Sequence, residues 1–155
     1  MIDFIVSALP AEPFAHLFEL SDDELGARRA VRRVVDKQPG VPCRVSLRDV
    51  AIGETVVLVH YEHLPVESPF RASHAIYVSR AERARPAPNE VPAVLRSRLL
   101  SVRAFDTAGM LVDADACEGS AVEAVVHRLL SDPHAGYLHV HFAKPGCYAA
   151  RVDRA

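Results

Sequence analysis

Two histidines separated by one residue are the feature of this sequence that most suggests chemistry. His139 and His141 lie in the segment YLHVHFAKPGCY, which alternates apolar and polar residues like a β-strand. Imidazoles at positions i and i+2 of a strand share one face and can hold a metal ion, but a catalytic metal also needs a third ligand and an open position. A metal-dependent enzyme that uses His139 and His141, helped by His63 or His74, is one hypothesis. A metal-free ligand site and a solvated polar face are the alternatives.

A second group of polar residues surrounds a connection between two predicted strands. His63 ends the segment VVLVHYEH and His74 begins the segment SHAIYVSR, and the link LPVESPFRAS between them supplies Arg71 and Ser73. We expect this link to join two strands that are antiparallel neighbours, which brings His63 and His74 to the same rim of the sheet.

This rim predicts a pocket for a small anionic molecule, which is our first functional hypothesis. A guanidinium is a rigid fork of donors that matches carboxylate or phosphate, so Arg71 would clamp the anion and Ser73 would donate to it. His63 and His74 would orient the ligand or transfer protons. Arg44 and Arg103 are reserve clamps. In the alternative interpretation, Arg71 pairs with Glu67 or with a carbonyl at a strand end, and His74 is a core histidine whose hydrogen bonds are satisfied.

The link after the His139 strand decides which side chains accompany the histidines. Pro145 and Gly146 fit the central positions of a type II turn, which places Cys147 on the face opposite the imidazoles. A four-residue loop gives the same result, whereas a three-residue loop would exchange the faces. We therefore predict that Tyr148 neighbours His141, and that Cys147 forms no catalytic pair with a histidine.

The elements that must position these residues are mainly strands. A capping box at Ser21 and Glu24 predicts a helix that places Arg28 four residues after Glu24, in the favoured order for an ion pair. The segment GSAVEAVVHRLLSDP predicts a second helix with a capping box at Ser120 and Glu123. The first strand is expected at residues 2–9. The other expected strands are short, β-branched or aromatic segments: ETVVLVHYEH, SHAIYVSR, LLSVRAFD, MLVDADA, YLHVHFA and CYAARV. This pattern predicts an α+β fold, a largely antiparallel sheet with one or two packed helices.

Composition limits the classes of protein to consider. A chain of 155 residues with 50% apolar residues predicts one globular domain over residues 1–155, with the proline-rich segment ERARPAPNEVP as a surface loop. A net charge of −2, 6% aromatic residues and no Trp argue against nucleic acid as a partner. The apolar runs are too short for a membrane span, and neither a secretory signal nor a disulfide pattern is evident, so we expect a cytoplasmic protein with reduced thiols.

Four strings along the chain carry a resemblance to a known family: PGVPCRVSLRD, HYEHLPVESPFRASHAIYV, SVRAFDTAGM and YLHVHFAKPGCYAARVDR. In this order they resemble an uncharacterised bacterial family, the domain of unknown function 1203, from Pro39 to Arg154. The resemblance implies a single-domain bacterial cytoplasmic protein and brings no activity, cofactor or catalytic residue. A structural or protein-interaction domain without a small-molecule site, such as a homodimer formed through a flat apolar patch, therefore remains a competing hypothesis.

Overall fold

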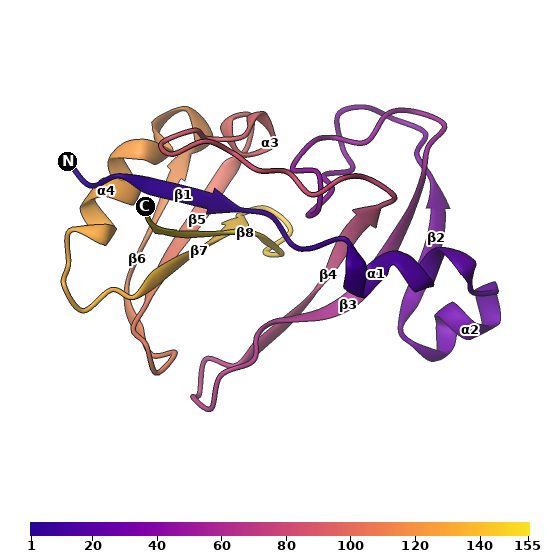
Figure 1. The fold of residues 1–155 in the computed structure, drawn as a ribbon, viewed down its shortest axis with the longest axis horizontal. Helices are drawn as coiled ribbons and strands as arrows, with labels where there is room; N and C mark the ends of the chain where they lie inside the picture. The colour runs from indigo at the N-terminus through magenta and orange to yellow at the C-terminus, as the bar shows by residue number, and fades with distance from the viewer.

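The strands form two antiparallel sheets, which Figure 1 shows side by side. The structure is a computed structural model that describes all residues from 1 to 155. The five-stranded sheet has the order β1 (Phe4–Ser7), β8 (Tyr148–Arg154), β7 (Tyr137–Phe142), β5 (Leu99–Phe105) and β6 (Leu111–Glu118). The three-stranded sheet has the order β2 (Ala30–Val34), β3 (Thr55–Leu64) and β4 (Ala72–Ser79).

The helices are short, and the longest has nine residues. They are α1 (Glu12–Ala15), α2 (Asp22–Ala27), α3 (Ala93–Arg96), α4 (Val122–Leu130) and the 3₁₀ turns η1 (His16–Glu19) and η2 (Gly119–Ala121). The α+β prediction and the predicted strands are confirmed, but the strands divide between two sheets and the helices are more numerous than expected. None of the helices is long and apolar enough to cross a membrane.

Each sheet has its own apolar core. The apolar stripe of α4 packs on the five-stranded sheet, where Leu129 and Leu130 join Leu138 and Val140 of β7 in a cluster of 21 buried residues. A second cluster of 14 buried residues joins the three-stranded sheet to α1 and α2. Full burial of one such aliphatic side chain contributes about 1.5–3 kcal/mol, so both clusters stabilise the fold substantially.

The proline-rich segment, residues 82–92, crosses from one sheet to the other without a helix or strand, as predicted for a loop. It is hydrogen-bonded to both sides: Ala84 N–H donates to the carbonyl of Val45 (2.8 Å), and Asn89 N–H donates to the carbonyl of Phe4 (2.8 Å). The segment is therefore held against both cores. The assignment of residues 1–155 to one domain remains a prediction.

The basic run after α2 differs from the sequence prediction. The capping box of Ser21 and Glu24 is present, but α2 ends at Ala27 and β2 follows at once. Arg29 has a positive φ of 55°, a backbone conformation that ends the helix and redirects the chain. Glu24 caps the helix, so Arg28 bonds to the carbonyl of Glu24 and not to its carboxylate. The predicted helical ion pair was wrong.

The second predicted capping box, at Ser120 and Glu123, is absent. A 3₁₀ turn leads into α4, and no side chain caps the helix. Glu123 forms an ion pair with Arg96 in place of the box. The chain enters this turn at Gly119, whose N–H donates to the carbonyl of Arg98 (2.8 Å), so a contact with the segment around α3 sets the entry geometry.

Candidate metal centre

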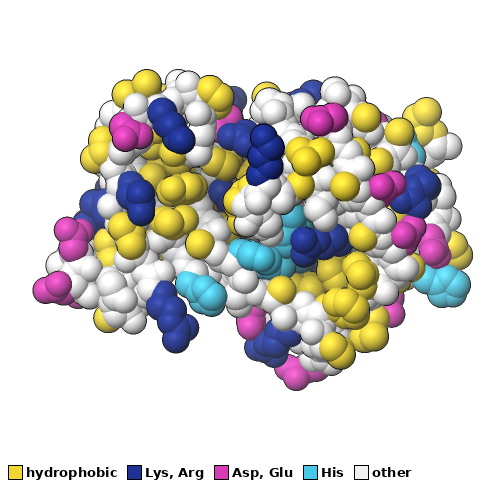
Figure 2. All heavy atoms as spheres, turned by 180° about the vertical axis from the view of Figure 1, so that it is seen from behind, with side chains coloured by type: hydrophobic (Ala, Val, Ile, Leu, Met, Phe, Trp, Pro, Cys, Tyr) yellow, Lys and Arg dark blue, Asp and Glu magenta, His cyan; other side chains and the backbone are white.

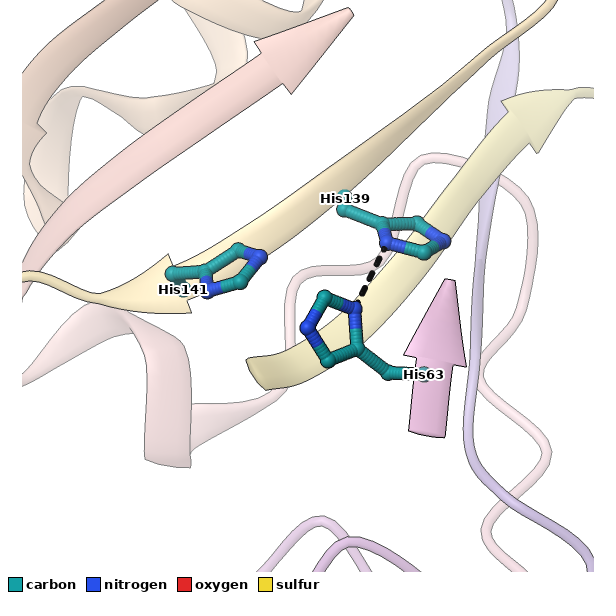
Figure 3. A group of neighbouring side chains, drawn as sticks. All are labelled: His63, His139 and His141. Atoms are coloured by element: carbon teal, nitrogen blue, oxygen red, sulfur yellow. Dashed lines mark hydrogen bonds between the residues drawn. The ribbon is translucent and has the colours of Figure 1, made fainter. Parts of the chain in front are cut away.

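Three histidines from the two sheets converge on one point (Figure 3). His63 comes from β3, and His139 and His141 come from β7. Each offers a ring nitrogen, and the three nitrogens lie within 4.8 Å of one another. The residues are 8%, 3% and 0% exposed, respectively. In the space-filling view, histidine side chains gather in the middle of the back face, where the two halves of the molecule meet, beside a basic side chain (Figure 2).

Strand β7 is buried on both faces, because α4 packs against one face and the three-stranded sheet covers the other. Leu138 and Val140 face the core under α4. By alternation His139 and His141 occupy the other face, where His63 of the three-stranded sheet covers them. The sequence interpretation of a half-buried strand was therefore wrong, and the solvated polar face is excluded.

A β-bulge lies at His63. Tyr61 pairs with His74 and Leu64 pairs with Ala72, so β3 has two residues where β4 has only Ser73. Such bulges bend a strand and redirect its side chains. Nε2 of His63 lies 2.9 Å from Nδ1 of His74, which confirms the prediction that these histidines share a rim.

The hairpin after β7 confirms the predicted faces through a different loop. Gly146 N–H donates to the carbonyl of Phe142 (2.8 Å) and closes a four-residue loop, so the predicted type II turn was wrong. The parity is the same, and Tyr148 lies opposite His141 in the sheet. Cys147 Sγ accepts a hydrogen bond from Arg44 Nη2 (2.9 Å) and forms none with either imidazole.

The hydrogen bonds of His141 identify its tautomer. Its Nδ1 lies 2.9 Å from the carbonyl oxygen of Gly146. Because a carbonyl only accepts, Nδ1 carries the proton and Nε2 carries a lone pair. That Nε2 is buried and has no hydrogen-bond partner. A buried polar atom left unpaired costs about 1–3 kcal/mol, and metal-ligating histidines commonly donate their other N–H to a backbone carbonyl in this way.

All three imidazoles are neutral near pH 7. Burial, together with the neighbouring His74 and Arg103, lowers the pKa of His63 to about 4. Burial likewise lowers the pKa of His139 and of His141 to about 3 each. Neutral imidazole is the form that binds metal, so these histidines can bind an ion near pH 7 without first losing a proton.

The spacing of two ligand nitrogens already matches a tetrahedral ion. Nδ1 of His63 and Nδ1 of His139 lie 3.4 Å apart, at the long limit for a hydrogen bond. Two ligands at zinc–nitrogen distances of 2.0–2.1 Å and a tetrahedral angle are separated by roughly 3.3 Å. If His63 binds through Nδ1, its Nε2–H is free to donate to His74, which then orients the ring.

Tyr148 completes the surroundings of the cluster. Its ring stacks on His63 with centroids 5.0 Å apart and planes 11° from parallel. Burial raises the pKa of its phenol, which therefore stays protonated. The side chain supplies an apolar wall and a neutral hydroxyl.

Arg71 has carboxylate partners. Its guanidinium bonds to Glu62 through Nε (2.9 Å) and to Glu67 through Nη1 (2.8 Å), as in the alternative interpretation of the sequence. The pairing occupies the fork that an anion would need, so it does not favour Arg71 as the clamp. Ser73 lies opposite the bulge of β3. The roles of Arg71 and Ser73 in ligand binding remain predictions.

One protein family matches the part of the chain that contains the histidine cluster. Residues 40–154 match the family described as Protein of unknown function (DUF1203). The chain belongs to this family. The match contains all three cluster histidines, as well as His74 and Tyr148, whereas β1, α1, α2 and β2 precede it. Neither the curated proteins nor the solved structures contain a significant match to the chain.

Sequence reasoning named all three histidines of the cluster but not the groups that hold them. The carbonyl of Gly146, which orients His141, has no signature in the sequence, because every residue carries a carbonyl. Arg103 was named only as a reserve clamp, yet it pairs with His139 across β5 and β7. Alternation shows which residues of each strand share a face, but the sequence does not show that β5 pairs with β7. That pairing places Arg103 beside His139.

Proposed function

We propose that this protein binds a divalent transition-metal ion, zinc in the first instance, through His63, His139 and His141. The observation that carries the proposal is the buried Nε2 of His141, which has no partner while its Nδ1–H is held by Gly146. Imidazole suits zinc, copper, iron and nickel, and a metal-free cluster would leave this nitrogen unsatisfied.

The set of ligands favours a catalytic over a structural metal. Structural zinc sites are closed by four protein ligands, whereas three histidines leave a coordination position open. Three neutral ligands also leave the double positive charge of the ion uncompensated. Such an ion acts as a Lewis acid and lowers the pKa of a bound water, so the metal-dependent enzyme is the form of this function that we favour.

The other candidate is a buried polar network that joins the two sheets without a ligand. The 3.4 Å contact between His63 and His139 joins the two sheets, and the 2.9 Å hydrogen bond between His63 and His74 extends the network within the three-stranded sheet, which supports this alternative. It gives no role to Nε2 of His141. For that reason we rank it second.

Metal content and affinity test the proposal directly. Protein purified without an affinity tag would be assayed for metals, stripped with a chelator and titrated with zinc by calorimetry. We expect one ion per chain in the wild type. We expect His139→Ala and His141→Ala to weaken binding by more than the roughly 100-fold that loss of a hydrogen bond to a ligand costs.

His134→Ala is the matched control, because the His134 side chain is 83% exposed and lies outside the cluster. It should bind zinc as the wild type does. Circular dichroism would show that each variant is folded. Wild-type protein that binds no zinc, or cluster variants that bind as tightly as the control, would reject the metal centre in favour of the polar network.

A further inference from the structure

A small hollow adjoins the histidine cluster. It has a volume of about 250 Å³, and His63 and Arg103 form the polar part of its wall. The rest of the wall is apolar and includes Phe70 and Phe105, whose rings meet edge to face with centroids 6.3 Å apart. Drug-sized ligands need roughly 300–1,000 Å³, so this hollow suits a smaller molecule.

Arg103 is a cation without a carboxylate partner. Its Nε donates to Ser101 Oγ (3.2 Å), and its two terminal nitrogens form no hydrogen bond with the protein. None of the ion pairs in the structure includes it, whereas Arg71 and Arg151 are each paired with acids. Four N–H donors of Arg103 therefore remain free.

Arg103 lines the hollow together with His63 and lies on the same side of its sheet as the cluster. Arg103 lies directly opposite His139 in the pairing of β5 with β7, so the two side chains occupy the same face of the sheet. The guanidinium is partly buried, and a partly buried charge without a counter-ion is unfavourable. A bound anion would remove this cost.

The larger cavity of the protein offers a weaker clamp. It has a volume of about 620 Å³ and includes Arg44 and His74 in its wall. Arg44 is only 2% exposed, and its three nitrogens donate to the carbonyls of Tyr148 and Pro42 and to Cys147. Its donors thus mainly join segments of the chain, whereas those of Arg103 are free.

We infer that the hollow binds a small organic monoanion, with Arg103 gripping its carboxylate and the apolar walls enclosing its body. The planar fork of arginine matches a carboxylate through two parallel hydrogen bonds. One cation and mostly apolar walls fit a carboxylate with a hydrocarbon body better than a multiply charged phosphate. The inference goes beyond the metal centre and does not require it, although His63 would place the anion beside the ion.

Benzoate is a suitable probe, because it is a small aromatic monoanion. It would be titrated by calorimetry and NMR into metal-free and zinc-treated protein, with benzamide as the uncharged molecule of the same shape. We expect benzoate to bind, benzamide to bind at least tenfold more weakly, and Arg103→Gln to weaken benzoate binding by roughly 10–100-fold, as for the loss of a charged hydrogen bond.

Two further variants make the test specific. Arg85→Gln removes an exposed arginine that does not line the hollow, and it should leave benzoate binding unchanged. Arg103→Lys keeps the charge without the fork, and its affinity should lie between those of the wild type and Arg103→Gln.

The inference is overturned if benzoate fails to bind at concentrations up to about 10 mM, the limit of weak but measurable affinity. It is also overturned if benzamide binds equally well, or if Arg103→Gln binds benzoate like the wild type. Zinc affinity, measured separately on Arg103→Gln, should persist. Failure of zinc binding with retained benzoate binding would therefore reject the metal centre alone.

Discussion

Replacing His141 by leucine should separate the effect of this histidine on the stability of the metal-free protein from its effect on metal binding. In the metal-free protein the change removes the bond from Nδ1–H to Gly146, worth about 1 kcal/mol. It also removes the unpaired Nε2, which costs about 1–3 kcal/mol. Gly146 is only partly buried, so water can replace the lost donor. The metal-free variant should therefore be as stable as the wild type, or up to about 2 kcal/mol more stable.

With metal the order reverses. Zinc at 100 times its dissociation constant should stabilise the wild type by about 2.7 kcal/mol, because only the folded state presents the site. The leucine variant lacks a ligand and should gain almost nothing. If His141 contributed only to packing, zinc would stabilise the wild type and the leucine variant equally, and the order of their stabilities would not reverse.

Urea unfolding with chelator and with zinc would measure both effects, with His134→Leu as the exposed control. A loss of more than about 3 kcal/mol in metal-free His141→Leu would mean that Nε2 has a partner or that the ring is irreplaceable in packing. Equal zinc stabilisation of wild type and variant would remove His141 from the ligand set.

Three other measurements probe the structure around the site. The metal-free protein should lose stability as pH falls from about 6.5, where unfolded histidines take up protons that the buried cluster, with pKa values of about 3 to about 4, refuses. The loss approaches about 1.4 kcal/mol per pH unit for each cluster histidine, and a urea midpoint unchanged between pH 7.5 and 5 would contradict it. Gly119→Ala should destabilise by at least about 1–3 kcal/mol in thermal unfolding, because a Cβ there would lie 1.9 Å from the carbonyl oxygen of Leu95, whereas Gly26→Ala meets nothing within 4 Å and should be neutral or stabilising. Cys147→Ser should leave zinc affinity unchanged in calorimetry, because the thiol bonds to Arg44; a marked loss would place the sulfur among the ligands.

Local patterns in the sequence were sufficient wherever neighbouring segments alone set the geometry. The link between β3 and β4 joins two adjacent antiparallel strands, so chain connectivity brings His63 to His74. The parity of the hairpin after β7 places Tyr148 beside His141, even though the loop type was wrong. The capping box at Ser21 likewise depends on residues within one turn of the helix.

Contacts between distant segments decided the rest. The meeting of His63 with His139 joins residues 76 positions apart, and it depends on how one sheet packs over the other. The same packing buries both faces of β7 and leaves Arg103, and not Arg71, with free donors beside the cluster. Periodicity identifies which residues share a face of a strand. It contains no information on what covers that face, because the covering surface is assembled from residues far away in the chain.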